Sequence, residues 1–440
     1  MTGQLLLALS ILVGLHEWGH YITAKWFKMR VNKFYLFFDF LFPLPNVLNF
    51  SLWKKKIGDT TYGLGWFPLG GYVDIAGMID ENKDASQLES VPQPWEFRSK
   101  PAWQRLIVML GGVTVNVIIG IAIFVGMALY YGHDYLKASD VKYGIVAQQF
   151  GKEIGLKTGD KIIAINSKPF DDFADVRKVF IENNSNYTVE RNGEQLTVYV
   201  PNNLIDKISD KKNIRQFVEP IEPFRVGEVA PAMPAAKAGL KTGDSIVAIN
   251  NQPVRFYHEL QDVLLNNKNK DLNFAVSRAG QTVNMVVRPN EEGKIGFYPE
   301  LLLKTTHIDY GIGEALVAGT NNAFNVVIDN VKGFGKIFRG EVAASKALSG
   351  PIGIAQMFGG VWIWQKFWLL TGMLSMVLAF MNLLPIPALD GGHALILIYE
   401  MVSGRKPSEK FLEVSQSIGM FILLGLMVYS FGNDIFKFFR

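Results

Sequence analysis

Four long apolar stretches constrain the fold of this chain more than any other feature of its sequence. They cover residues 5–26, 106–130, 367–384 and 414–433, and only the first contains histidine or charged side chains. About 20 apolar residues in an α-helix cross the ~30 Å hydrocarbon layer of a membrane. Because 49% of the 440 residues are also apolar, the sequence predicts a multi-pass α-helical membrane protein with four transmembrane helices.

The net charge and the lack of cysteine exclude some kinds of binding partner and of metal site. A net charge of +4 over 440 residues is too small to indicate nucleic-acid binding. The absence of cysteine excludes thiolate metal ligands and disulfide bonds. A fifth apolar stretch, residues 315–328, is too short to cross the bilayer. We therefore expect it to lie at the membrane surface or against other helices.

Basic residues near the ends of the four stretches predict the orientation of the chain. Lysine and arginine gather after the first stretch, before the second, and between the third and fourth, which places those connections in the cytoplasm. Both termini and the long segment 131–366 then lie on the outer side. No basic segment precedes the first stretch and no small-residue cleavage site follows it, so we expect it to stay in the mature protein.

An internal repeat lies within the long outer segment. Residues 155–166 (GLKTGDKIIAIN) and 239–250 (GLKTGDSIVAIN) agree at ten of twelve positions. Each copy reads as a tight Gly-Asp turn leading into a short strand, and a helical pattern follows. The pair resembles tandem PDZ domains, which bind an extended peptide at a sheet edge. The alternative is that the two domains only shield the membrane site from large folded proteins.

The first apolar stretch contains the string His-Glu-Trp-Gly-His at residues 16–20. The spacing of four places His16 and His20 one turn apart on the same helix face, where both imidazoles can reach one metal ion. Glu17 can approach the remaining coordination position and accept a proton from a bound water. Bound zinc lowers the pKa of such a water to ~7, so the string indicates zinc-dependent hydrolysis.

The apolar surroundings of this string favour a functional interpretation. An unpaired ionisable side chain inside a membrane costs roughly 2.5–3.5 kcal/mol, so His16, Glu17 and His20 are expected to serve a function there. An ion or proton transporter would also justify these side chains and stays an alternative, although it would not explain the duplicated domains. A catalytically idle membrane adaptor is a third hypothesis, which a damaged metal motif would favour, and the motif is intact.

A third metal ligand is predicted just after the third apolar stretch. Residues 382–393 read NLLPIPALDGGH, in which two prolines end a regular helix and Asp390 follows in a bent segment. Bent backbone at membrane depth is tolerated only where it is buried in protein or lines a wet cavity, and hydrolysis needs such a cavity. The predicted orientation places His16, His20 and Asp390 all toward the cytoplasmic side. Two histidines, one carboxylate and an open position form a catalytic zinc site.

These two motifs and the repeat between them resemble the site-2 metalloproteases over essentially the whole chain, in particular the bacterial regulator of sigma E protease type. The resemblance implies a zinc-dependent intramembrane endopeptidase of the bacterial inner membrane, with the PDZ domains outside the cytoplasm. Its substrates would be single-span membrane proteins, such as an anti-sigma factor or a remnant signal peptide. By this resemblance the Zn²⁺ ligands are His16, His20 and Asp390, the general base is Glu17, and a substrate-binding residue is Asn382.

The same resemblance divides the chain into eight segments. They are the first transmembrane helix (1–30), a cytoplasmic-side loop with a membrane re-entrant β-hairpin (31–100), the second transmembrane helix (101–131), the first and second PDZ domains (132–220 and 221–305), interfacial amphipathic helices (306–366), the third transmembrane helix (367–393), and a cytoplasmic loop with the fourth transmembrane helix (394–440). We expect the hairpin to clamp the unwound substrate by backbone hydrogen bonds. An ordinary interfacial loop is the alternative.

Two positions depart from the pattern of these proteases. Phe38-Asp39-Phe40 stands where relatives usually carry Gly-x-Gly, and Gly111-Gly112-Val113 stands where they usually carry Gly-Pro. We expect both departures to change the substrate groove and to leave the catalytic centre untouched. His393 has no role by the resemblance, and we expect it to be structural. The sequence leaves open the physiological substrate, the trigger of cleavage and the oligomeric state.

Overall fold

The computed structural model describes residues 1–440 except 42–47, 69, 79–90, 210–215 and 439–440. Parts of the predicted cytoplasmic loop (79–90) and of the predicted first PDZ domain (210–215) therefore lie outside the described residues. The chain forms two compact units. The helical unit contains residues 1–132, 309–335 and 347–440, and the β-rich unit contains residues 133–308 and 336–346.

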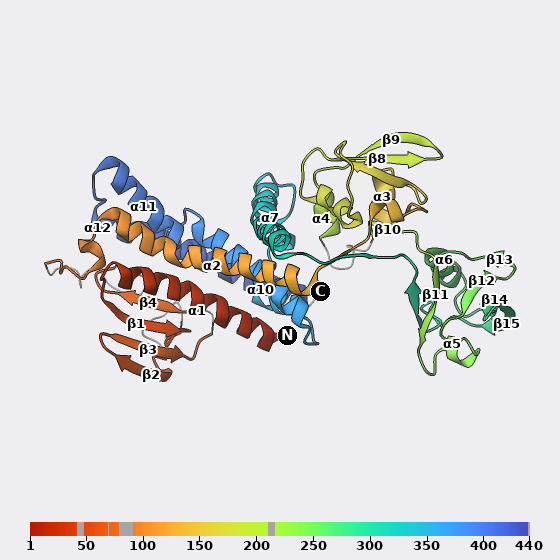
Figure 1. The fold of residues 1–440 in the computed structure, drawn as a ribbon, viewed down its shortest axis with the longest axis horizontal. Coiled ribbons are helices and arrows are strands. Elements are labelled where there is room, and N and C mark those ends of the chain that lie inside the picture. Colours follow the sequence, from red (N-terminus) through yellow and green to blue (C-terminus); the bar gives the residue numbers. More distant parts are fainter. Residues whose placement is uncertain (42–47, 69, 79–90, 210–215, 439–440) are drawn as a thin grey trace. The chain divides into compact units, whose positions relative to one another are not determined.

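Four helices of the helical unit are long and apolar enough to cross a membrane. They are α1 (Thr2–Trp26), α2 (Ala102–Tyr131), α10 (Trp364–Leu383) and α12 (Glu409–Phe438). These helices coincide with the four predicted stretches, so that prediction is confirmed. Helix α2 lies between the others: it packs against α1, α10 and the shorter α11 (Asp390–Ser403), as Figure 1 shows.

Glycines allow α1 and α2 to approach closely at their crossing point. A β-carbon on Gly111 would lie 2.6 Å from the backbone oxygen of Gly19, and one on Gly19 would collide with the backbone of Gly111. Small residues at such a crossing let two helix backbones come into direct contact. The Gly111-Gly112 pair is thus a packing feature that brings α2 up against the helix face carrying His16 and His20.

The segment between α1 and α2 folds into a four-stranded sheet beside α1. Its strands, β1 (Val31–Leu36), β2 (Ser51–Ile57), β3 (Thr60–Gly65) and β4 (Tyr72–Ile75), follow the order β2-β3-β1-β4. Strand β1 runs parallel to β3 and antiparallel to β4. Strands β2 and β3 form the predicted hairpin, and they turn at Gly58, whose φ of +60° favours glycine. Strand β2 is an edge of the sheet, and its side chains are mostly exposed.

The third long helix ends earlier than predicted, and the segment that follows it contains a second, shorter helix. Helix α10 ends at Leu383, the two prolines occupy the turn, and α11 begins at Asp390. Residues 384–393 are therefore not part of the third long helix, and residues 394–403 are helical instead of forming a loop. Gly404 ends α11 with a left-handed φ of +67°, the usual helix-terminating role of glycine.

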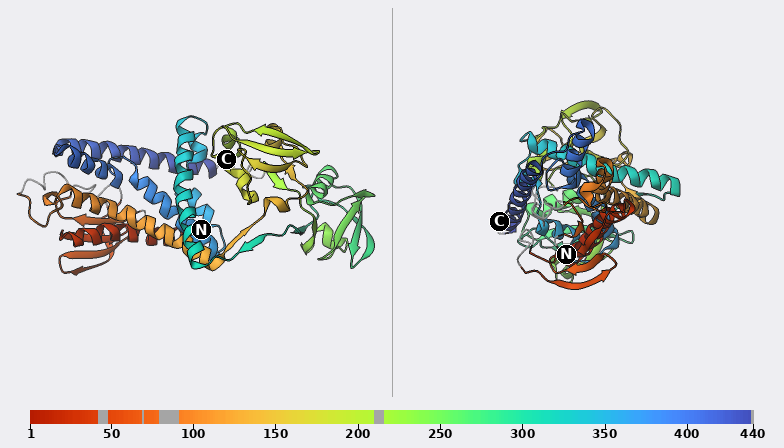
Figure 2. Two further views of the ribbon diagram at one scale, coloured as in Figure 1. Left: turned by 45° about the horizontal axis from the view of Figure 1, so that its top comes forward. Right: turned by 90° about the vertical axis from the view of Figure 1, so that its left-hand side faces the viewer.

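Helix α7 (Ile312–Phe338) contains the fifth apolar stretch and extends beyond it at both ends. It packs through Ala323 against Phe124 of α2 and Met376 of α10, while many of its other apolar side chains are exposed. Figure 2 shows α7 crossing the long helices at a steep angle. Two short helices, α8 (Ala344–Ala347) and α9 (Pro351–Phe358), precede α10.

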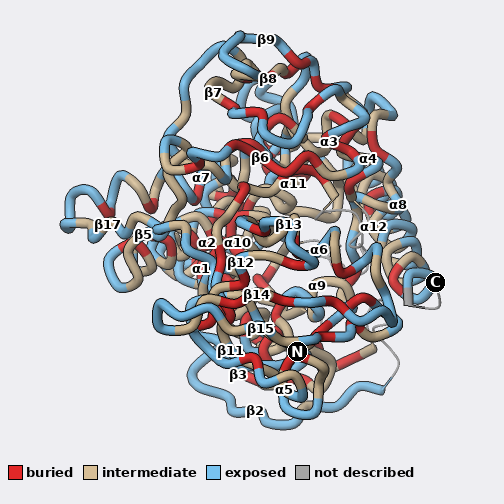
Figure 3. The backbone as a smooth tube through the Cα atoms, turned by 90° about the vertical axis from the view of Figure 1, so that its right-hand side faces the viewer, coloured by how far each residue is buried: buried red, intermediate tan, exposed pale blue. Residues whose placement is uncertain are grey.

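The β-rich unit consists of two modules, each with its own hydrophobic core, and Figure 3 shows the buried segments of the chain in red. The first module contains β6 (Ile145–Ala147), α3 (Gln149–Glu153), β7 (Lys161–Ile165), a 3₁₀ helix (Phe173–Phe180), β8 (Asn186–Arg191), β9 (Glu194–Tyr199), α4 (Leu204–Ile208) and β10 (Val218–Pro220). The second contains β11 (Phe224–Val229), α5 (Pro234–Lys237), β12 (Ser245–Ile249), β13 (Gln252–Pro253), α6 (Tyr257–Asn266), β14 (Leu272–Arg278), β15 (Gln281–Val287) and β16 (Phe297–Leu301). Strands β5 (His133–Tyr135) and β17 (Thr306–Ile308) pair at the two ends of this part of the chain.

The repeated Gly-Asp turn has the same structure in both modules. Asp160 and Asp244 are buried, and each accepts a 2.8 Å hydrogen bond from the backbone N–H three residues earlier. Each also accepts two hydrogen bonds from the guanidinium of an arginine on a later strand, Arg191 in the first module and Arg278 in the second. The sequence repeat therefore corresponds to a structural repeat.

Candidate metal centre

Helix α1 presents His16 and His20 on one face, as their spacing predicts. Their Nε2 atoms are 3.2 Å apart, and the two rings meet edge to face at 83°. Asp390, at the first position of α11, reaches the same point, because its Oδ2 lies 3.3 Å from His16 Nε2 and 3.4 Å from His20 Nε2. The structure thus brings together all three residues predicted to hold the metal.

The turn between α10 and α11 explains how Asp390 reaches the histidines. A β-carbon on Gly391 would collide with the backbone of Leu383, and one on Gly392 with the backbone of Ile386. The two glycines therefore allow α11 to fold back tightly against the end of α10. Ala388, two residues before the aspartate, has a φ of +80°, an unfavourable conformation for a residue with a side chain.

The geometry of the three donor atoms fits zinc. Bonds of about 2.0–2.1 Å in a tetrahedral centre would separate neighbouring ligand atoms by roughly 3.3–3.4 Å, close to the three separations of 3.2–3.4 Å observed here. Asp390 Oδ2 is also buried without a hydrogen-bond donor among the residues that the structure describes. A buried carboxylate oxygen facing two imidazole nitrogens is costly, and a cation between the three atoms removes that cost.

Helix α2 orients both imidazoles. His20 Nδ1 lies 2.8 Å from the backbone oxygen of Val108, so this nitrogen carries the proton and Nε2 keeps its lone pair for a metal. Asn116 Nδ2 lies 3.3 Å from His16 Nδ1, while its buried Oδ1 has no partner among the described atoms. Turning this amide by 180° pairs Oδ1 with a protonated His16 Nδ1 and orients the second ring in the same way.

The sequence analysis did not assign roles at the site to Val108 and Asn116. An amide in the middle of an apolar span was the available signal for Asn116, because polar side chains at that depth usually contact protein or water. Nothing in the sequence identifies Val108, since its backbone oxygen is the contacting group.

Gly112 lies closer to the metal centre than the sequence analysis predicted. We expected the Gly111-Gly112-Val113 departure to leave this centre untouched. A β-carbon on Gly112 would lie 2.5 Å from His20 Nε2 and 2.6 Å from His16 Cε1. This glycine therefore borders the two imidazoles directly. The expectation was wrong because the sequence does not show which face of α2 contacts α1.

The other predicted residues lie around the same point. Asn382, on the last turn of α10, has its Nδ2 3.3 Å from His16 Nε2. Glu17 is half-buried, and a β-carbon on Gly71, next to strand β4, would lie 3.4 Å from Glu17 Cγ. His393 is not part of the cluster of potential ligands; it lines a cavity together with Pro387 and Ala388.

Comparison with known proteins now identifies the family. The pattern of peptidase family M50 matches residues 4–426. The chain belongs to peptidase family M50. The M50 chain is 28% identical to the regulator of sigma E protease of Haemophilus influenzae, covering 99% of this chain and 98% of that protein. It is also 29% identical, over 98% of its length and 97% of the relative, to a Fusobacterium nucleatum protein named as a zinc metalloprotease.

A third relative, the regulator of sigma-E protease RseP of Salmonella typhimurium, is 27% identical over 98% of this chain and 97% of that protein. Membership of family M50 makes the chain a zinc metalloendopeptidase, and the four long apolar helices make it a membrane protein. This decides against the transporter and adaptor hypotheses. In this M50 peptidase, two residues of the candidate metal centre, His16 and His20, therefore lie on a helix long enough to cross a membrane, and Asp390 opens the shorter helix α11.

Proposed function

We propose that this M50 peptidase hydrolyses peptide bonds inside the transmembrane segments of single-span proteins, using zinc held by His16, His20 and Asp390. The observation that carries the proposal is the triangle of three donor atoms, 3.2–3.4 Å on each side, on two apolar helices. The orphaned Asp390 oxygen and the proton on His20 Nδ1 add independent support. Zinc held by these three residues would supply a water with a pKa of ~7 and a Lewis acid for the scissile carbonyl.

The side chains around the donor triangle have distinct proposed roles. Glu17 accepts the proton from the attacking water and then donates it to the leaving nitrogen as the peptide C–N bond breaks. Asn382, close to His16 on α10, donates its amide N–H to a substrate carbonyl and so aligns the scissile bond. Burial of the site within the helical unit limits the water that can reach the reacting bond.

When the substrate helix unwinds, its backbone N–H and C=O groups need new hydrogen-bond partners. A peptide bond inside a helix is protected by hydrogen bonds, and a membrane offers no water to replace them. The exposed edge strand β2 provides replacement donors and acceptors and carries exposed Leu52 and Trp53. We therefore assign the clamp to this strand, next to the bilayer. Proline substitutions along β2 that left cleavage unchanged would argue against this assignment.

The two modules of the β-rich unit are proposed to be PDZ domains on the outer side of the bacterial inner membrane. The positive-inside distribution of lysine and arginine supports this orientation, with the metal centre toward the cytoplasm. Two relatives carry the name regulator of sigma E protease, which suggests an anti-sigma factor as one substrate of this chain. Two roles of these modules fit the proposal: they bind a peptide at a sheet edge, or they exclude large folded proteins from the membrane site.

The test is cleavage of a reporter with one transmembrane helix, reconstituted with wild type or Glu17→Gln, together with zinc analysis of both proteins. Retention of about one zinc per chain by both, with cleavage only by the wild type, supports the proposed roles. Glu291→Gln, an exposed change in the β-rich unit, is the matched control and should cut normally. Equal cleavage by Glu17→Gln, or absence of zinc from the wild type, would contradict the proposal.

A further inference from the structure

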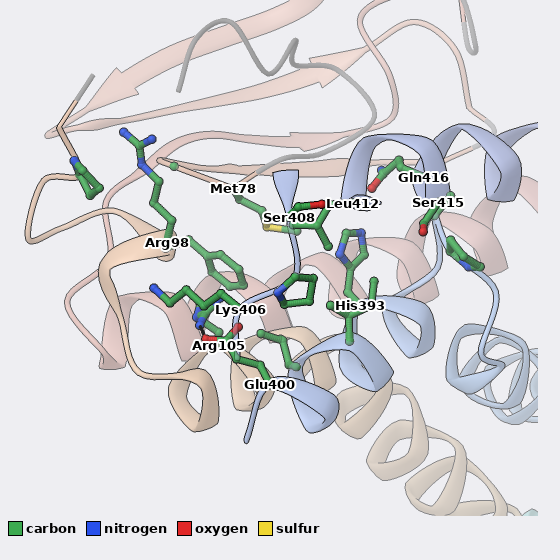
Figure 4. A pocket seen from close by; sticks show the side chains of 18 residues that line it. Met78, Arg98, Arg105, His393, Glu400, Lys406, Ser408, Leu412, Ser415 and Gln416 are labelled. Carbon is green, nitrogen blue, oxygen red and sulfur yellow. Dashed lines mark hydrogen bonds and ion pairs between the residues drawn. The ribbon is translucent and has the colours of Figure 1, made fainter. Parts of the chain in front are cut away.

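A cavity within the helical unit borders the turn that leads into Asp390. It has a volume of about 440 Å³ and is enclosed by the ends of α2, α11 and α12 and by the segments on either side of residues 79–90. This volume falls in the range of small-molecule sites, ~300–1,000 Å³. Figure 4 shows Arg98, Arg105 and Lys406 on one side of the cavity and His393 and Gln416 on the other.

Among the residues that the structure describes, the charged side chains of the lining leave one positive charge without an ion-pair partner. Arg105 is buried and forms a 2.5 Å ion pair with Glu400, and Arg98 forms a 2.6 Å ion pair with Glu96. Lys406 also lines the cavity, and among the described residues it forms no ion pair. The cavity therefore presents one exposed ammonium together with two guanidinium groups whose charges are already paired, an arrangement that suits a singly charged anion.

The rest of the lining combines an apolar wall with uncharged hydrogen-bonding groups. Ile396 and Leu397 of α11 and Leu412 of α12 belong to the apolar part, and Ser415 and Gln416 of α12 supply hydroxyl and amide groups. An occupant that satisfies these walls has an anionic head, hydroxyl or ester oxygens and an apolar tail. Since the basic residues lie at the ends of the long helices, the cavity is expected at the level of the lipid headgroups.

We infer that this cavity binds one anionic phospholipid through a singly charged phosphodiester headgroup, with Lys406 as its ion partner. The same cavity is lined by Pro387 and Ala388, the residues that lead into Asp390. A bound headgroup therefore contacts the turn that carries a proposed zinc ligand, including the strained Ala388. The inference concerns lipid binding and does not depend on the protease reaction.

The experiment measures binding of phosphatidylglycerol to the delipidated full-length protein in detergent by native mass spectrometry. Phosphatidylcholine with the same acyl chains is the comparison lipid, because its headgroup has no net charge. We expect one phosphatidylglycerol per chain, bound at least tenfold more tightly than phosphatidylcholine. Lys406→Gln should weaken this binding about fivefold, the effect of one basic residue at an anionic headgroup.

Two further variants separate the cavity from general surface attraction. Lys410→Gln removes the same charge four residues further along the chain, at the start of α12, but Lys410 does not line the cavity, so the affinity of this variant should stay within twofold of wild type. Ile396→Trp fills the apolar part of the cavity without changing its charge and should abolish tight binding. If this variant unfolds at a lower temperature than the wild type, Leu412→Trp is used in its place.

Three outcomes would overturn the inference. Equal losses in Lys406→Gln and Lys410→Gln would show surface attraction only. Equal affinity for the two lipids would show that the cavity selects the acyl chain and not the headgroup. Displacement of the lipid by millimolar glycerol phosphate would show a site for a soluble phosphate ester instead of a membrane lipid.

Discussion

Replacing Gly112 by alanine tests the geometry of the metal centre with a single methyl group. The added β-carbon would lie 2.5 Å from His20 Nε2 and 2.6 Å from His16 Cε1. Ordinary contact begins near 3.4 Å, so the imidazoles would have to retreat by roughly 0.8–0.9 Å, whereas metal–ligand distances tolerate about 0.2 Å. Both histidines lie at the end of a flexible side chain, so the helices can stay packed while the ligand geometry is lost.

The expected result is a folded protein with weakened zinc binding. We expect the affinity for zinc to fall by at least the ~10–100-fold typical of changes next to a metal ligand, with a parallel loss of reporter cleavage. Zinc affinity is measured by competition with a chelator, and folding by thermal unfolding of the metal-free protein. Gly126→Ala, on the same helix with no atom near the added carbon, should bind zinc normally. A Gly112→Ala affinity within twofold of wild type would refute the packing argument.

Three other changes have defined outcomes. Asn116→Ala should lower zinc affinity ~10–100-fold in the same chelator competition, because it removes the partner of His16 Nδ1. Gly391→Ala should reduce both zinc content and cleavage. The added β-carbon would collide with the end of α10 and displace the carboxylate of the neighbouring Asp390. The Arg278 guanidinium holds the pKa of Asp244 below its ordinary value, so this carboxylate stabilises the second module above pH ~4 and loses that effect as the pH falls through the lowered pKa. Hydrogen exchange of residues 272–278 should rise over that range in wild type, and Asp244→Asn should cost ~1–3 kcal/mol and remove the acid dependence.

The long helices and the three proposed ligands could be predicted because each rests on one strong local rule. Twenty apolar residues specify a membrane-crossing helix, and a spacing of four specifies a shared helix face. The third ligand needed a different argument, since Asp390 lies far along the chain from His16. It was found because two prolines and a carboxylate inside an apolar region have few explanations other than function.

The helix that begins at Asp390 was not predicted, for a physical reason. Residues 394–403 are apolar and lie between a proline-rich turn and a basic segment, which suited a loop as well as a short helix. In the structure this helix packs against α2 and ends at Gly404. Its stability comes from tertiary packing, which no local pattern of ten residues reveals.

The supporting contacts of the metal centre form a pattern that is visible only once the face of α2 is known. Val108, Gly112 and Asn116 are spaced four residues apart, so they line one stripe of the helix. The first supplies a carbonyl to His20, the second leaves room for both imidazoles, and the third supplies its amide to His16. A rotation of α2 by one residue, 100°, would remove all three contacts while leaving an equally apolar helix. Helix α2 therefore acts as the template of the metal centre although it provides no ligand, and changes along this stripe should affect zinc before they affect the fold.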